Sequence, residues 1–559
     1  MTFSYPAVLL KLLEWPNTSS YYQTKLVQPQ RHEYETIDYL LICWHFFLSA
    51  CGSDASQGDA IDANNGMTGD SDAASPVEPG WPQEPLACGD WAEGSQEDDD
   101  GATRDFYNRA ANLAWRNLGG DWADVNGDEQ GVAAYALTTI SDDNTPQWQS
   151  WDISSLVQGW HDATWPNKGL LVRTPGGTYE FASREHAEQG FRPELVVETA
   201  SGTQSIPALR DVGMKLSTFQ GYGDSDTMRV TGTGDNVILS FDLSSFSGEN
   251  ITKATLRLYK LQDFGGGDNE VGVYRLTHGL ERADSGPTWG IAAAFPDDEN
   301  IEQHTSVLLS SDFESGNWSE AWSSGEENEH FQRVGASEEN GFVPHLGQAM
   351  RDRFPAGDNY GGSLIYKYQD KTGAEPDEAF FRYYLRFGDN WQPTFGGKLP
   401  GVSGTYGRAG WGGRKVDGTD GWSARGSYGQ TVPAGNPLGN SVPIGNYVYH
   451  ADMAGDYGDI DSWQQGCAGI LEKGRWYSVE TQVKLNTPGM NDGVIRGWVD
   501  GRLAYERSDW RFRDVDTLKV EQIWMNFYHG GTATPDQEIS VYIDNVVIAS
   551  EYIGPMKSR

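Results

Sequence analysis

The stretch that decides the fold is FFRYYLRF, at residues 380–387. Aromatic and apolar residues dominate it without helical spacing, which favours a β-strand. It is one of several strand signals in the last 250 residues or so. The others are YSVETQVKL at 477–485, VIRGWV at 494–499 and ISVYIDNV at 539–546.

A tight turn follows the third of these runs. Asp500-Gly501, a favoured hairpin dipeptide, separates VIRGWV from the run LAYE at 503–506, which predicts a β-hairpin. Gly, Pro and Asn turns punctuate the whole region, and helical periodicity is almost absent. Residues 305–559 are therefore predicted to form an all-β jelly-roll sandwich.

The composition of the full chain agrees with this fold class. The chain has 559 residues, enough for about three compact units. It holds 21 Trp, 26 Tyr, 21 Phe and 68 Gly, a pattern typical of β-sandwiches with many turns. Aromatic side chains on sheet faces also suit sugar rings, although most of them are expected in the core.

The net charge is −39, and this excludes nucleic acid as an expected partner. One segment reverses the sign. Between residues 396 and 425, five basic residues (Lys398, Arg408, Arg414, Lys415 and Arg425) accompany only two acidic ones. A local basic island in an acidic chain is a candidate site for a polyanion. For any one of these residues, the simpler interpretation is a solvated surface charge.

Residues 1–50 are predicted to be a signal peptide. The apolar run YLLICWHFFL at 39–48 is too short to span a bilayer as a mature helix, and LSAC at 48–51 follows it. This resembles the lipobox of bacterial lipoproteins, in which the cysteine, here Cys51, carries lipid. The resemblance implies an extracytoplasmic protein, anchored to the cell surface, to the periplasmic face of the membrane or to the outer membrane, or else secreted.

Residues 51–102 are rich in Asp, Gly, Ser, Ala and Pro and are predicted to be a disordered acidic tether. Two cysteines remain beyond Cys51, namely Cys88 and Cys467. They lie in different regions of the chain, and the sequence assigns them no partner.

Two segments of predicted strands follow the tether. Residues 103–203 resemble the second half of the DNRLRE-type β-sandwich module on runs such as GLLVR (169–173) and LVVE (195–198). Residues 204–304 resemble its first half on VILSFDL (237–243) and ATLRLY (254–259). Either two modules are truncated, or the halves close into one circularly permuted sandwich. The second arrangement is favoured because half a sandwich would expose an apolar face.

Three short runs carry the chemistry: GGKLPG at 396–401, WSAR at 422–425 and YVYH at 447–450. They supply Lys398, Ser423, Arg425, Tyr447 and Tyr449. The two tyrosines are spaced i, i+2 and project from the same face of a strand. Arg408, Arg414, Trp422 and His450 are predicted to bind substrate.

These residue types suit β-elimination on a uronate polymer. Removal of the weakly acidic C5 proton needs a cation or strong donors beside the carboxylate. A tyrosine can act as base or acid if a neighbouring cation lowers its pKa. Tyr447 and Tyr449 are the candidates for proton transfer, and Lys398 and Arg425 for charge neutralisation.

The same residues carry a family resemblance. Residues 305–555 resemble the alginate and glucuronan lyases of polysaccharide lyase family 14, on the three runs above together with LNTPG (485–489) and FYHGG (527–531). The resemblance implies a jelly-roll lyase that acts on alginate, with polymannuronate as the expected substrate and Lys398, Ser423, Arg425, Tyr447 and Tyr449 in the active site. The Gly-rich stretch 426–446 departs from the expected pattern and is predicted to reshape the cleft.

Other signals are weaker. DVNGDE at 124–129 is similar to a calcium loop but lacks the glycine at the sixth position and the acidic twelfth residue, so no metal and no cofactor is expected beyond a weak possibility of structural calcium. No protein partner is indicated.

Three classes of function stay open. The first is a lyase on alginate or on another polyuronate such as glucuronan. The second is a non-catalytic carbohydrate-binding surface lipoprotein. The third, a glycosidase, is disfavoured because EPDE at 375–378 is the nearest pair of carboxylates and contains a proline.

Overall fold

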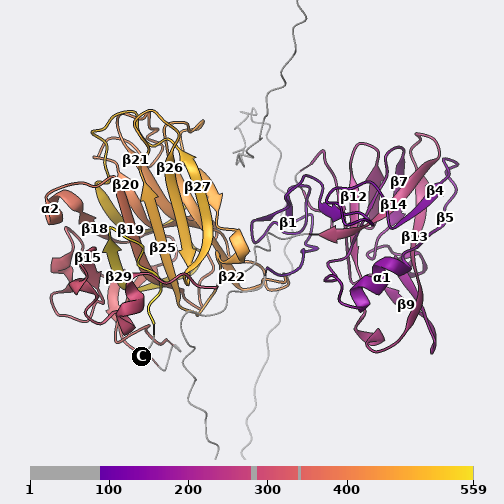
Figure 1. Cartoon of the computed structure of the whole chain (residues 1–559), viewed down its shortest axis with the longest axis horizontal. Coiled ribbons are helices and arrows are strands. Elements are labelled where there is room, and N and C mark those ends of the chain that lie inside the picture. The colour runs from indigo at the N-terminus through magenta and orange to yellow at the C-terminus, as the bar shows by residue number, and fades with distance from the viewer. Residues whose placement is uncertain (1–87, 219, 278–285, 338–341, 558–559) are drawn as a thin grey trace, which may run out of the picture. The chain divides into compact units, whose positions relative to one another are not determined.

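The computed structural model describes residues 88–218, 220–277, 286–337 and 342–557, all within one compact unit of the chain. The predicted signal peptide, Cys51 and the first part of the predicted tether lie outside these residues. Figure 1 shows that strands are the main regular elements of the described chain. Within it, no helix is long and apolar enough to span a membrane.

The described chain begins inside the segment predicted to be a tether. Trp91 is fully buried, and its Nε1 donates a hydrogen bond to the Lys168 carbonyl at 3.0 Å. The backbone N–H of Ala102 bonds the Ala92 carbonyl at 2.7 Å. Residues 88–102 are therefore packed structure, and the tether prediction was wrong for them because Trp91, Ala92 and Ala102 are buried there.

The strands of residues 103–277 form two six-stranded sheets and a small hairpin. One sheet contains β3 (Asp121–Ala123), β4 (Ala136–Ile140), β6 (Leu170–Arg173), β10 (Arg210–Met214), β12 (Asn236–Ser240) and β14 (Asn269–Thr277). The other contains β5 (Gln147–Asp152), β7 (Thr178–Ala182), β8 (Glu194–Thr199), β9 (Gly202–Pro207), β11 (Thr227–Thr231) and β13 (Ile251–Asp263). The hairpin pairs β1 (Phe106–Asn108) with β2 (Leu113–Ala114), and α1 covers Ser154–His161.

Strands from the two predicted half-modules are interleaved within each sheet. β13, from residues 204–304, pairs with β5, β7 and β8 from residues 103–203. β14 likewise pairs with β3, β4 and β6. A single buried core, which includes Trp151, Phe181 and Leu256, lies between the sheets. The two segments thus make one sandwich, the N-terminal sandwich, and neither half is left with an exposed apolar face.

A second sandwich, the C-terminal sandwich, follows from residue 307. Its first sheet contains β15 (Val307–Ser311), β16 (Phe331–Val334), β17 (Ala349–Phe354), β19 (Glu378–Phe387), β25 (Tyr477–Lys484), β26 (Gly493–Val499), β27 (Arg502–Trp510) and β29 (Ile539–Ala549). Its second sheet contains β18 (Tyr360–Lys367), β20 (Gly397–Gly404), β21 (Trp422–Tyr428), β22 (Ser441–Tyr449), β23 (Asp459–Ser462), β24 (Ile470–Glu472) and β28 (Gln522–His529). The short helix α2 spans Tyr368–Thr372. All the pairs are antiparallel, as a jelly roll requires.

The run that decides the fold is the central strand β19, between β29 and β25. Its residues Phe381, Tyr383, Leu385 and Phe387 enter the main core between the two sheets. The residues between them are buried on the opposite side, where Arg382 pairs with Asp298. Burial on both faces explains why the run lacks the polar alternation of an ordinary sandwich strand.

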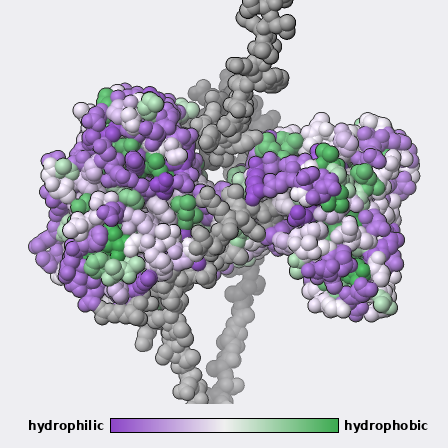
Figure 2. All heavy atoms as spheres, in the orientation of Figure 1, coloured by the Kyte–Doolittle hydropathy of each residue, from purple (hydrophilic) through white to green (hydrophobic). Residues whose placement is uncertain are grey.

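The predicted hairpin is also present. β26 and β27 are joined by Asp500-Gly501, with φ of +48° and +75°. Both values lie in the left-handed region that this type of tight turn requires, and glycine adopts it without strain. The surface seen in Figure 2 is mostly hydrophilic, with small and separate hydrophobic areas.

Candidate active site

Four neighbouring strands of the second sheet, in the order β28, β20, β21 and β22, carry the predicted site. Arg425 lies opposite Tyr447, and Lys398 lies opposite Tyr528. Trp422 and Ala424 alternate with the site residues of β21 and point into the core. Because side chains alternate along a strand, Ser423, Arg425 and the two tyrosines share the opposite face of the sheet.

A β-bulge sets the position of Lys398. The pairing of β20 with β21 passes from Leu399↔Gly426 directly to Gly401↔Arg425, so Pro400 is the extra residue. Leu399 and Val402 both enter the core although they are three residues apart. Proline has no N–H to donate and therefore fits an unpaired bulge position. The bulge lets the strand present Lys398 to the site without misplacing the core residues beyond it.

Lys398 is partly buried among aromatic rings. Its Nζ lies 4.5 Å from the centre of the Tyr447 ring and 5.4 Å from that of Tyr528. Within the described part of the chain, no carboxylate forms an ion pair with it. Burial, and next the charge of Arg425, lower the pKa of Lys398 to about 8. The site therefore holds a cation whose charge has no counter-ion.

Arg425 is the second cation, and it is almost fully buried. Its Nη2 donates hydrogen bonds to the backbone carbonyl of Asn526 at 2.9 Å and to Asn526 Oδ1 at 2.8 Å. Its guanidinium lies 4.5 Å from the centre of the Trp524 ring. Burial lowers the pKa of Arg425 to about 10, so it stays protonated at neutral pH. Arg425 is a fixed positive charge beneath the site.

Tyr447 and Tyr449 are in contact through their hydroxyl groups, which lie 3.5 Å apart. Each phenolic oxygen also accepts a backbone N–H, from Gly458 at 3.2 Å for Tyr447 and from Gly413 at 3.1 Å for Tyr449. Tyr447 is partly exposed, whereas Tyr449 is 1% exposed. Burial, and next the hydrogen bond with Tyr449, raise the pKa of Tyr447 and outweigh the lowering expected from a neighbouring cation, here Arg425. Tyr447 is therefore the phenol that a bound polymer can reach directly.

The remaining predicted residues are placed differently. Ser423 is fully buried, and its Oγ donates to the Gly410 carbonyl at 2.7 Å, so it anchors the loop between β20 and β21. Arg408 and Arg414 are exposed on that loop, and Arg414 lies 4.3 Å from the centre of the Trp411 ring. Their role in binding stays a prediction.

Two predicted substrate-binding residues need correction. Trp422 is fully buried in the core, where its Nε1 donates to the Lys519 carbonyl at 3.1 Å. His450 is 4% exposed, bonds Asp459 at 2.8 Å and packs edge-on against Trp510. Neither ring presents a face to a ligand, because each side chain points to the side of the strand opposite to the tyrosines and Ser423.

Residues 348–545 match the family model Polysaccharide lyase 14. The C-terminal sandwich thus contains the part of the chain that matches this polysaccharide lyase model, and it is called the lyase domain below. None of the curated proteins compared with the chain matches it.

Solved structures similar to the lyase domain include three polysaccharide lyases. The alginate lyase Aly36B is 21% identical over 44% of this chain and 94% of its own, with a TM-score of 0.33. The marine PL-14 alginate lyase from Aplysia kurodai is 15% identical over 44% and 100%, with a TM-score of 0.34. The endo-β-1,4-glucuronan lyase from the fungus Trichoderma reesei is 16% identical over 44% and 96%, with a TM-score of 0.31.

Strand β28 of the lyase domain supplies three site residues that the sequence reasoning missed. Trp524, Asn526 and Tyr528 alternate along the strand and face Lys398 and Arg425. The i, i+2 spacing of aromatic and amide side chains in WMNFYH was the available signal, since the residues between them are apolar and enter the core.

The Gly-rich stretch that was expected to reshape the cleft contacts another part of the chain. Val432 and Leu438 are buried in one cluster with Trp91 and Tyr107 of the N-terminal segment. The side-chain amides of Asn436 and Asn108 exchange hydrogen bonds of 2.8 and 2.9 Å. The stretch thus holds residues 88–115 against the lyase domain, just before the strand that carries the tyrosines.

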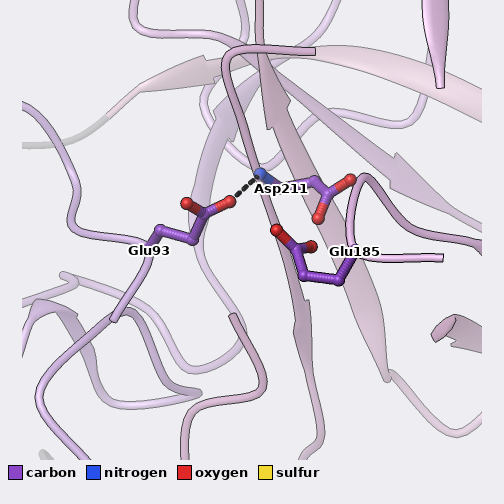
Figure 3. Close-up of side chains that lie close together, drawn as sticks. All are labelled: Glu93, Glu185 and Asp211. Atoms are coloured by element: carbon purple, nitrogen blue, oxygen red, sulfur yellow. Dashed lines mark hydrogen bonds between the residues drawn. The ribbon is translucent and has the colours of Figure 1, made fainter. Parts of the chain in front are cut away.

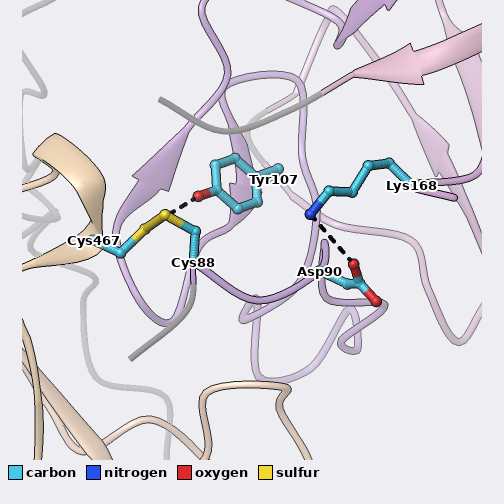
Figure 4. Close-up of a disulfide and its surroundings, with 5 residues drawn as sticks. All are labelled: Cys88, Asp90, Tyr107, Lys168 and Cys467. Atoms are coloured by element: carbon cyan, nitrogen blue, oxygen red, sulfur yellow. Dashed lines mark hydrogen bonds and ion pairs between the residues drawn. A yellow bond between two sulfur atoms is a disulfide. The ribbon is translucent and has the colours of Figure 1, made fainter. Parts of the chain in front are cut away.

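A disulfide reinforces the same contact. Cys88 and Cys467 are bonded, 379 residues apart in the sequence. Figure 4 shows the bond with the hydroxyl of Tyr107 beside Cys467, at 3.9 Å from its sulfur. The two cysteines that the sequence left unassigned therefore link the start of the described chain to the lyase domain.

One group of three acidic residues in the described chain brings its oxygens within 4.8 Å of one another: Glu93, Glu185 and Asp211 (Figure 3). Arg184 donates from Nε and Nη2 to the two oxygens of Glu93, at 2.6 and 2.8 Å. The backbone N–H of Arg184 donates to Asp211 at 2.8 Å. The side chain and backbone of Arg184 thus already donate hydrogen bonds to Glu93 and Asp211, and we interpret the group as a structural ion-pair network.

In the predicted weak calcium loop, backbone N–H groups likewise already bind the carboxylate of Asp124. Asp124 accepts the N–H groups of Asn126 at 2.8 Å and Asp128 at 3.1 Å through one oxygen, and that of Ala133 at 3.2 Å through the other. The carboxylate closes a turn, which gives no support to a cation there.

Proposed function

We propose that the lyase domain cleaves a uronate-containing polysaccharide by β-elimination, with alginate, and within it polymannuronate, as the expected substrate. The proposal depends most on one observation: the unpaired Lys398 ammonium lies over the ring of Tyr447, whose hydroxyl contacts that of Tyr449. A cation and two phenols are thus assembled on one sheet face of a polysaccharide lyase.

Lys398 is the group suited to bind the substrate carboxylate. It is partly exposed, whereas Arg425 is buried and bound to Asn526. Burial and the charge of Arg425 both disfavour the protonated form of Lys398, and an incoming carboxylate would offset these effects by its opposite charge. Arg425 adds a fixed positive field that favours negative charge developing on the carboxylate during proton removal.

The tyrosine pair is suited to the proton transfers. A base takes the C5 proton, the electron pair forms the C4–C5 double bond, and the C4–oxygen bond breaks. A proton then passes to the departing glycosidic oxygen, so that each cleavage leaves one unsaturated and one ordinary end. The 3.5 Å hydroxyl contact lets one phenol restore the proton of the other. We assign the exposed position next to the sugar to Tyr447.

The sheet also offers a path for a polymer. Adjacent strands lie about 4.8 Å apart, so the three gaps from β28 to β22 span about 14 Å. Tyr528 lies at one side of this path and Tyr447 at the other. Tyr360, on the next strand, is 65% exposed and meets Tyr528 edge-on, with ring centres 5.2 Å apart. A polysaccharide that crosses the strands would meet aromatic rings on both sides of Lys398.

We also propose that the protein acts outside the cytoplasm, held by lipid on Cys51. The run LSAC, which ends at Cys51, supports this location. The Cys88–Cys467 disulfide is a second support, since such bonds persist mainly in oxidising compartments. Labelling with a radioactive fatty acid tests the anchor: the intact chain should incorporate it, and Cys51→Ala should not.

The activity is tested on polymannuronate, polyguluronate and glucuronan by following the ultraviolet absorbance of unsaturated uronate. We expect absorbance from at least one polymer, and its loss in Tyr449→Phe and Lys398→Ala with the fold retained by circular dichroism. Reducing ends without absorbance would show hydrolysis. Retention on the polymers without any product would show the alternative function, a non-catalytic binding protein. Near-normal rates in both variants would contradict the residue assignment.

A further inference from the structure

Strand β18, which pairs with β28 beside the site, contains a bulge of two glycines. Its pairing with β28 shifts by one residue between Tyr360 and Ser363, so Gly361 and Gly362 together oppose a single residue of β28. Glycines within a strand mark such a bulge or a close approach by another group. Here a side chain of the other sheet approaches: Asp352, on β17, is fully buried and accepts the Gly362 N–H at 2.8 Å.

The two glycines leave the space that Asp352 needs. A methyl group at Gly361 would lie 2.5 Å from Asp352 Oδ2, and one at Gly362 would overlap the ring of Phe331. Phe331 is the partner of Asp352 in the pairing of β16 with β17, so both side chains leave the first sheet on the same face. The bulge therefore fits this pair of side chains.

From the bulge, a chain of hydrogen bonds reaches the buried cation of the site. The carbonyl of Gly362 accepts a hydrogen bond from Asn526 Nδ2 at 3.1 Å, and Asn526 Oδ1 accepts one from Arg425 Nη2 at 2.8 Å. An amide side chain donates through its nitrogen and accepts through its oxygen. The Gly362 carbonyl therefore holds the nitrogen of Asn526 on its own side and leaves the oxygen facing the guanidinium.

We propose that Asp352 is a positioning residue for Arg425 and acts through Gly362 and Asn526. The inference rests on the proposed lyase activity, in which Arg425 supplies a fixed positive charge. Asp352 is fully buried and so does not contact the polymer itself. Burial raises its pKa to about 8, so at pH 7 it is mainly a neutral acid, which accepts the Gly362 N–H without adding a negative charge beneath the site. A buried carboxyl group costs stability relative to an apolar side chain, and holding the bulge in place gives this group a role.

The test compares Asp352→Ala with Asp352→Asn in the full chain. Asp352→Asn keeps an oxygen that can accept the Gly362 N–H, whereas Asp352→Ala keeps none. If Asp352→Ala does not fold, Asp352→Leu, which fills the space without an acceptor, takes its place. Asp544→Ala is the matched control. Asp544 is also a fully buried acid of the first sheet, and among the described residues its hydrogen bonds go to the N–H groups of Leu346 and Asn545.

We expect kcat to fall about tenfold in Asp352→Ala, with a smaller change in KM, and to stay near normal in Asp352→Asn and Asp544→Ala. Asp352→Ala combined with Asn526→Ala should be no slower than Asn526→Ala alone, because both changes break the same chain of hydrogen bonds. A normal kcat in Asp352→Ala, multiplied losses in the double variant, or an equal loss in Asp352→Asn or Asp544→Ala would overturn the proposal.

A second readout needs no turnover and so separates this inference from the proposed function. The guanidinium signals of Arg425 can be followed by NMR in protein with isotopically labelled arginine, and they are assigned by their absence in Arg425→Lys. They should shift in Asp352→Ala and in Asn526→Ala, and should stay in place in Asp352→Asn and Asp544→Ala. Unshifted signals in Asp352→Ala would overturn the positioning role. If the wild type forms no unsaturated product, the proposed function fails, and these signals alone decide the positioning role.

Discussion

Lys398 Nζ lies 4.5 Å from the centre of the Tyr447 ring, and among the described residues it forms no ion pair with a carboxylate. The side chain is held by aromatic contacts alone. Burial lowers its pKa to about 8, below the ordinary value of 10.5, so the fold disfavours the charged form that the proposed reaction needs. The buried charge lowers the stability of the fold, and it leaves a cation that can bind a substrate carboxylate.

Lys398→Met should therefore abolish activity and stabilise the protein. The lowered pKa means that the folded state carries a penalty below about pH 8, which disappears as pH rises towards 10.5. The pKa difference corresponds to at most about 3 kcal/mol in the free energy of unfolding, equivalent to a few degrees in melting temperature. Thermal melts at pH 6 and pH 10 measure this penalty: the melting temperature of the variant should exceed that of the wild type by more at pH 6 than at pH 10. An equal or larger gain at pH 10 would contradict the account.

The same group sets an upper pH limit for catalysis. Because kcat/KM reports the free enzyme, it should fall above about pH 8, as Lys398 loses its proton. Lys398→Arg remains protonated, so its slower reaction should keep a constant kcat/KM to at least one pH unit higher. The measurement is a pH profile of kcat/KM for both proteins. An alkaline limb at the same pH in both would show that another group is responsible.

Asn526 positions Arg425 through two hydrogen bonds, of 2.9 and 2.8 Å. Asn526→Ala keeps the carbonyl bond but removes the side-chain bond, which should let the guanidinium shift. We expect kcat to fall about 10–100-fold with a smaller change in KM, since small displacements at a charged site are costly. Gln522→Ala, on the same strand and bonded to Ser403, is the matched control and should retain near-normal kcat. Equal losses in both variants would indicate damage to the strand itself.

The Cys88–Cys467 disulfide should stabilise the contact between the N-terminal segment and the lyase domain. Because it closes a very long loop, its loss should lower the free energy of unfolding by about 2–5 kcal/mol. Cys88→Ser and Cys467→Ser should show the same decrease in melting temperature, and the double variant no further decrease. Reduction of the wild-type protein should reproduce it. Additive losses in the double variant would mean that the two cysteines act separately.

Much of the lyase fold and half of its site follow from the sequence. Tyr447 and Tyr449 share a face because the strand period is two, and the Asp500-Gly501 hairpin follows from local turn chemistry. The same period places Trp422 opposite Ser423 and so in the core, which the substrate-binding prediction for Trp422 overlooked.

Other features depend on contacts between distant residues. Nothing near Cys88 identifies Cys467 as its partner, and nothing near Asn526 identifies Arg425. The Gly-rich stretch reads locally as a loop, and only its contact with the N-terminal segment shows that Val432 and Leu438 are buried there. Residues 88–102 are another example: their composition is typical of a tether, but Trp91 is buried in one cluster with Val432 and Leu438, and Cys88 is bonded to Cys467.

The central claim is elimination at the tyrosine pair, and the mass of the products tests it most directly. Digests of polymannuronate, polyguluronate and glucuronan by the intact protein are compared with digests by Tyr447→Phe in mass spectrometry. The account predicts oligosaccharides from at least one polymer whose new ends are lighter by one water than hydrolysis products, and their absence with Tyr447→Phe. Products that retain the water, or unsaturated products from Tyr447→Phe at the wild-type rate, would contradict it.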